Sequence, residues 1–167
     1  ARQADADTYD VHDLIREFLL RSLSTALREE FHGKCAEWYQ KQTSSYEVQI
    51  ELIYHAIKSS QFEAASEIVV NEGRQLVSQG YMELLGLIEQ IEVDDLTSSV
   101  VIRMAQLQGD ILALLGRLNE AETVLNDTLE RAQSTAGELV QAEILSSLAD
   151  VSRKQGNSER SLNRHKA

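Results

Sequence analysis

Apolar residues recur at three- and four-residue intervals along most of the chain, the spacing that lines one face of an α-helix. Between these runs stand short polar segments such as "QTSSYE" and "EVDDLTSS", which separate one helix from the next. Gly80 ends one run, because a residue without a Cβ readily takes the left-handed conformation that closes a helix. The pattern predicts successive helices that begin at residue 11 and then cover 27–43, 47–58, 62–77, 81–91 and 97–115.

The remaining sequence repeats a helix–turn–helix plan. "QGDILALLGRLNEAETVL" (108–125) aligns with "ADVSRKQGNSERSLNRHK" (149–166) at an offset of 40 residues, and "SSQFEAASEIV" (59–69) fits the same turn and second helix. Tetratricopeptide repeats, with a period of about 34 residues, place small or apolar residues where paired helices pack closely. The packing positions expected here are Phe62, Ala65, Gly109, Gly116, Leu118, Ala121, Leu125 and Gly156. The alternative is a non-repeating helical bundle that reuses a glycine turn.

Composition supports a helical chain and excludes several partners. The 167 residues contain no proline and 8 glycines, and the net charge of −11 opposes nucleic acid and anionic membranes. The longest apolar stretches fall far short of the ~20 residues of a membrane helix. One cysteine and no signal sequence predict a cytoplasmic protein. We expect no direct nucleic-acid binding and no membrane contact.

Residues of catalytic or metal sites do not cluster in the sequence. No G-x-x-x-x-G-K-[ST] motif occurs, so the chain by itself is not expected to hydrolyse ATP. The four histidines are far apart and lack the spacing or cysteine company of a zinc site. Cys35, on the expected apolar face with Phe31 and Trp38, is interpreted as a core residue, and His55 as a packing and hydrogen-bonding residue. We therefore predict no catalytic residue and no metal.

Three segments in order, "YDVHDLIREFL", "CAEWYQKQ" and "ELIYHAIKSSQFEAASEIV", carry a family resemblance over residues 9–92. They resemble the stretch that follows the ATPase core in STAND-type signalling ATPases, particularly the MalT-like transcription activators. The resemblance implies an all-α fold of helical hairpins stacked as a right-handed superhelix. It divides the chain into winged-helix C-terminal helices (1–45), linking hairpins (46–96) and tetratricopeptide-like repeats (97–167), the last of them truncated.

Val11-His12-Asp13 is similar to the Met-His-Asp motif of related ATPases, whose histidine contacts the phosphates of bound ADP. The resemblance implies that His12 senses nucleotide in an intact parent, with Asp13 as a cap or hinge. A simpler interpretation makes His12 a solvated residue in the first turn of a helix. ADP or ATP is expected in the parent, and no cofactor in this segment.

The resemblance also implies the function and the partners of the chain. It would be a non-catalytic regulatory and protein-interaction segment of a signal-transduction or transcription regulator. Its partners would be an upstream ATPase domain of the same chain and an inducer or partner protein on the repeat surface. A truncated repeat also exposes an apolar edge, so we expect self-association there. The alternative function is a free-standing repeat scaffold that binds a partner protein without any nucleotide link.

Overall fold

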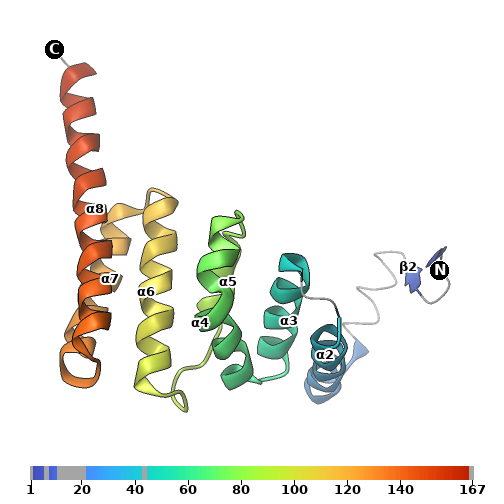
Figure 1. Cartoon of the computed structure of the whole chain (residues 1–167). Coiled ribbons are helices and arrows are strands. Elements are labelled where there is room, and N and C mark those ends of the chain that lie inside the picture. The colour runs from blue at the N-terminus through green and yellow to red at the C-terminus, as the bar shows by residue number, and fades with distance from the viewer. Residues whose placement is uncertain (1, 6–7, 11–21, 43–44, 166–167) are drawn as a thin grey trace.

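The computed structural model describes residues 2–5, 8–10, 22–42 and 45–165, with side chains described from residue 22 to residue 156. In this part of the chain seven α-helices stand side by side in one row, with α2 near one end and α8 at the other (Figure 1). The expectation of an α-helical architecture is confirmed to this extent. The helices are α2 (Thr25–Gln40), α3 (Tyr46–Lys58), α4 (Phe62–Ser78), α5 (Leu84–Ile88), α6 (Ser98–Leu114), α7 (Leu118–Thr135) and α8 (Glu138–His165).

A short β-hairpin at the beginning of the chain departs from the all-helical expectation. Strands β1 (Arg2–Asp5) and β2 (Thr8–Asp10) pair antiparallel, with Arg2 opposite Asp10 and Gln3 opposite Tyr9. These strands are held by backbone hydrogen bonds and carry no alternation of apolar and polar residues, the signal from which a strand is predicted. Asp10, the residue just before the helix predicted to begin at residue 11, is the last residue of β2.

The helix boundaries follow local capping chemistry. The side chains of Ser24 and Ser45 accept hydrogen bonds from the amides of Leu27 and Val48, so α2 and α3 begin one or two residues before their predicted starts. Gly80 lies just past the end of α4 with a φ of 96°, as predicted. The expected helix over 81–91 is shorter, and only Leu84–Ile88 is helical.

Each helix packs chiefly on its neighbours in sequence, α2 on α3, α3 on α4, α6 on α7 and α7 on α8. Helix α4 also packs on α6, with the short α5 beside both. The inward positions predicted for α3 are confirmed, since Ile53 and Ile57 are buried and Ile50 packs on the core. The largest fully buried apolar side chains are Ile53, Val69, Leu76, Leu84, Ile111, Leu125, Ile144 and Val151.

The predicted apolar face of α2 is largely exposed. Phe31 and Trp38 expose 46% and 55% of their surface, and Cys35 is half-buried. Ala36 is the one buried residue of α2, and it lies on the side opposite Phe31 and Trp38. The interpretation of Cys35 as a core residue beside two buried aromatics is therefore wrong. The helix turns Ala36, His32 and Tyr39 toward α3, and Phe31 and Trp38 away from it.

Helix α8 also corrects the sequence analysis. Gly156 was aligned with the turn glycine Gly116, yet the helix continues through it from Glu138 to His165. The sequence after Gly156 contains Leu162 as its one large apolar residue, so a second hairpin helix there would have little to bury. The truncated repeat expected at this end is therefore not formed as a hairpin.

Candidate functional site

The residues expected to sense nucleotide, His12 and Asp13, lie outside the described residues. The structure therefore gives no geometry for either side chain, and their role remains a prediction. No helix in the described part of the chain combines the length and apolar character needed to cross a bilayer.

Four of the packing positions taken from the repeat pattern lie in α6 and α7, where these two helices pack on each other. Gly109 and Leu125 are both buried, and a Cβ at residue 109 would lie 2.6 Å from Leu125 Cγ. Ala121 is fully buried one turn away, and Leu118 packs against the core at the first position of α7. The small residues Gly109 and Ala121 therefore allow the two helix backbones to approach closely.

Two turns share one geometry, at the end of α3 and at the end of α6. Ser60 and Gly116 have φ values of 58° and 78°, and the next residues, Gln61 and Arg117, have ψ values of 59° in both cases. The amides of Gln61 and Arg117 donate to carbonyl oxygens five residues back, at 2.8 and 2.9 Å. This is the Schellman arrangement, in which a left-handed residue ends a helix.

The residues after these two turns correspond as the sequence predicted. Phe62 and Leu118 each begin a helix and are half-buried against the core, and Ala65 and Ala121 are both fully buried. The α3–α4 and α6–α7 hairpins thus use the same turn and the same small residue. Gly156 does not belong to this set, because it lies within α8.

A second close approach, between α4 and α6, was not identified from the sequence. A Cβ at Gly73 would lie 2.3 Å from Leu107 Cδ2, and both residues are buried. The signal in the sequence is a lone glycine inside the apolar pattern of a helix, which often marks close packing. Gly73 therefore joins the two hairpins as Gly109 joins the two helices of one hairpin.

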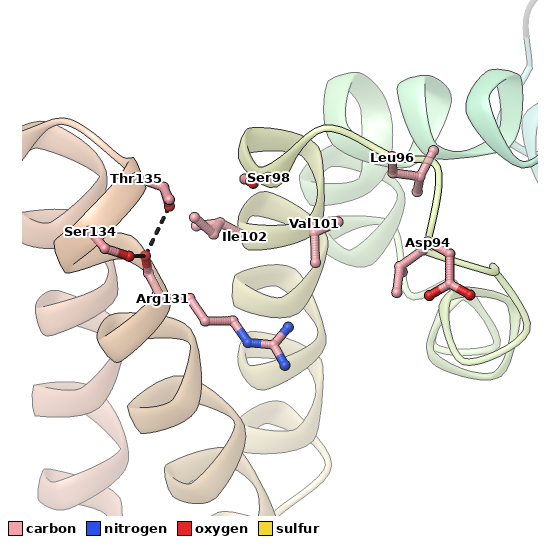
Figure 2. Close-up of a pocket in the computed structure, with 9 residues that line it drawn as sticks. Asp94, Leu96, Ser98, Val101, Ile102, Arg131, Ser134 and Thr135 are labelled. Carbon is pink, nitrogen blue, oxygen red and sulfur yellow. Dashed lines mark hydrogen bonds between the residues drawn. The ribbon is translucent and has the colours of Figure 1, made fainter.

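An open cavity of about 380 Å³ lies between the α5–α6 loop, the first turns of α6 and the end of α7. In Figure 2, Val101 and Ile102 lie on the α6 side, and Arg131 extends its guanidinium group from α7 toward them. Ser134 and Thr135, in the last turn of α7, donate their hydroxyl groups to the Arg131 carbonyl at 3.0 and 2.9 Å. The lining combines apolar side chains with one cation, the carboxylate of Asp94 and the hydroxyl groups of Ser98, Ser134 and Thr135.

A smaller cleft of about 270 Å³ separates α6 from α8. Asp110 of α6 lies in it, and burial raises the pKa of this carboxyl although a hydrogen bond from Ser147 acts in the opposite direction. Lys154 donates to the carbonyl of Ala113 at 3.1 Å, so α8 is tied to α6 across the cleft. Arg74 of α4 pairs with Glu143 of α8 at 3.3 Å. These polar contacts dock α8 along the row of helices.

His32 of α2 and His55 of α3 bring two titratable side chains into direct contact. Their Nδ1 atoms are 2.8 Å apart, and Tyr39 stacks on His55 with ring centroids 5.5 Å apart. His55 was expected to pack and hydrogen-bond, and this is confirmed, whereas its partner His32 was not foreseen. Among the described residues no three His, Cys, Asp or Glu side chains are placed to hold a metal ion.

No family model, no curated protein and no solved structure matches this chain.

Proposed function

We propose that this chain is a regulatory, protein-interaction segment of a multidomain STAND-type ATPase, and that it carries no reaction centre of its own. The family part of the proposal depends on the order of sequence motifs over residues 9–92. The interaction part depends mainly on one structural observation, a stripe of exposed apolar side chains on α2. We call Leu27, Phe31 and Trp38 the α2 stripe.

The α2 stripe lies along one side of the helix, and the ammonium group of Lys34 lies 5.6 Å from the Phe31 ring centroid. Residues four and eleven positions after Leu27 return to nearly the same side of a helix, so the three side chains point in one direction, opposite the buried Ala36. Grouped and exposed large apolar residues on a soluble protein mark contact surfaces, and aromatic residues are the usual centres of such contacts. Helix α2 is also the first helix of the described row in chain order (Figure 1). The stripe is therefore suited to an upstream ATPase domain of the same chain.

The remaining helices suit the other predicted partner, an inducer or partner protein. The shared turns of the α3–α4 and α6–α7 hairpins support a tetratricopeptide-like stack of hairpins. We propose that this stack forms a right-handed superhelix. Such stacks offer an elongated surface to a second protein. The cavity beside Arg131, which α6 and α7 line, is part of that surface. Nucleotide sensing by His12 and Asp13, with ADP or ATP held by the upstream domain, completes the proposal for the intact parent.

The test uses the upstream region of the same gene, expressed separately, and this chain. Isothermal titration calorimetry with ADP present should show binding, and Phe31→Ser together with Trp38→Ser should weaken it at least about tenfold, as loss of an aromatic anchor does. Leu139→Ser with Leu145→Ser is the matched control, because both leucines are exposed on α8 and should not touch the upstream domain. Lack of a phosphate-binding loop upstream, or equal binding by all variants, would contradict the proposal.

A second measurement separates the switch from a free-standing scaffold. In the full-length parent, His12→Ala should raise basal activity and reduce the ADP that co-purifies. A scaffold with no nucleotide link would show neither change.

A further inference from the structure

The contact between His32 and His55 admits only certain protonation states. The two Nδ1 atoms face each other at 2.8 Å, within hydrogen-bond distance, and the ring centroids are 4.9 Å apart. A neutral imidazole has one protonated and one bare nitrogen, so one ring donates its Nδ1–H to the bare Nδ1 of the other. Only one hydrogen can lie between the two atoms. The bond joins α2 to α3 through side chains alone.

Aromatic rings surround this pair. Tyr39 stacks on His55 at an interplanar angle of 22°. Tyr54 makes T-shaped ring contacts with His32 and His55, with centroids 5.7 and 5.2 Å apart. Both histidines are half-buried, so water solvates an imidazolium poorly at this place. Burial accordingly lowers the pKa of both rings.

The nearby charged groups do not offset this burial. Lys58 lowers the pKa of His32 further, and His32 itself lowers that of His55. The Glu51 carboxylate stands 3.8 Å from His55 Nε2, beyond hydrogen-bond distance, and its side chain is half exposed. Tyr39 and Cys35 are the other titratable groups of α2 at this contact, and the Tyr39 pKa is raised by its burial. Glu51 lies within ion-pair distance of His55, but an ion pair with a half-exposed carboxylate is weak and offsets only part of the repulsion between two imidazolium groups.

We propose that His32 and His55 form an acid-sensitive latch, which holds α2 on α3 while at least one Nδ1 is bare and releases α2 when both are protonated. One added proton leaves a charge-assisted hydrogen bond in place. A second places two N–H groups and two positive charges against each other at 2.8 Å. The contact surface on α2 would then separate from the rest of the row.

The pH range follows from the pKa directions. Unfolded histidine has a pKa of about 6.5, and both folded values lie below it. Above this range neither state binds the extra protons, and the latch has its full stability. As the pH falls below about 6.5 the released state binds more protons than the latched one, so the contact weakens progressively.

The chain contains a reporter for this motion. Trp38 is the only tryptophan in the sequence. The centroids of the Trp38 and Tyr39 rings are 4.9 Å apart, and Tyr39 stacks on His55. Tryptophan emission of the 167-residue chain should change between pH 7.5 and pH 5, while the helical circular dichroism of the other helices is retained. His55→Asn keeps a side-chain amide near the position of Nδ1 but cannot be protonated. The emission change in this variant should be less than half of that in the original chain.

His165→Asn is the control, because it removes a histidine from α8, at the other end of the row. It should leave the emission profile unchanged.

Equal acid profiles for the original chain and His55→Asn would overturn the latch. If His55→Asn does not fold at pH 7.5, the ring ¹⁵N spectrum of the original chain decides. Two histidines with depressed pKa values support the latch, and four that all titrate near the ordinary value refute it.

Discussion

Leu125 of α7 fills the space in which a side chain at Gly109 of α6 would lie, since a Cβ at position 109 would fall 2.6 Å from Leu125 Cγ. Leu125 is fully buried, and its side chain would have to shift to accommodate a Cβ at position 109. The close spacing of α6 and α7 at this point thus depends on the absence of a side chain at Gly109. The glycine costs helix stability within α6, and the close packing of α7 offsets that cost.

Gly109→Ala should therefore destabilise the chain although alanine favours a helix. Overpacking a core of this kind costs about 1–3 kcal/mol, which exceeds the gain of about 1 kcal/mol in helix propensity. Urea denaturation followed by circular dichroism measures the difference. Gly86→Ala is the matched control, because Gly86 is helical in α5 and a Cβ there would meet nothing within 4 Å. Equal or opposite effects of the two substitutions would refute this account of the α6–α7 interface.

The Schellman turns at Ser60 and Gly116 give opposite predictions for substitutions that involve glycine. Ser60 and Gly116 occupy equivalent positions with φ values of 58° and 78°. A residue with a side chain in this left-handed conformation costs about 1–2 kcal/mol. Ser60→Gly should raise the free energy of unfolding, although the larger entropy of glycine in the unfolded chain reduces the gain.

Gly116→Ala should lower the free energy of unfolding by about 1 kcal/mol for the same reason. Chemical denaturation of both variants tests the pair, with Gly137→Ala as the control at a glycine with open space and no left-handed φ. If Ser60→Gly and Gly116→Ala shift stability in the same direction, the two turns are not equivalent.

Local signals in the sequence predicted much of this fold. Gly80 and Gly116 ended helices as expected, and Ala65 and Ala121 are buried at equivalent positions. Each of these features depends on a residue and its near neighbours, so the pattern within a short window was sufficient.

Features that depend on distant contacts were missed. His32 and His55 are 23 positions apart and meet only because α2 lies on α3. The exposure of Phe31 and Trp38 depends on which face of α2 turns toward α3, and periodicity alone reads both aromatics as core. Gly156 resembles Gly116 locally, but the residues after it have no apolar face with which to form a second helix.

Neighbouring residues of α8 test which face of this helix is packed. Ile144 is fully buried, whereas Leu145 exposes 52% of its surface. Ile144→Ala should lower the free energy of unfolding by about 2–5 kcal/mol, through lost burial and the cavity that remains. Leu145→Ala, an equal loss of volume on the same helix, should change it by less than about 0.5 kcal/mol. Similar losses from both would mean that α8 is not docked on this face.

Asp110 gives a prediction about pH. Burial raises the pKa of this carboxyl in the folded chain, so its charged form is disfavoured there relative to the unfolded chain. The folded state therefore retains the proton over a pH range in which the unfolded state has lost it. Stability falls as the pH rises through this range, and the penalty is fully present at neutral pH.

Asp110→Asn removes the charge and should stabilise the chain at pH 7, with the gain shrinking toward pH 4 as the original carboxyl becomes protonated. Urea midpoints at several pH values measure this. The control is Asp127→Asn, at an exposed residue of α7, which removes the same charge from a chain of net charge −11. Any general relief of repulsion should appear equally in both variants. A gain for Asp110→Asn that does not exceed the control would show that the polar contacts from Ser147 and Lys154 outweigh burial in the α6–α8 cleft.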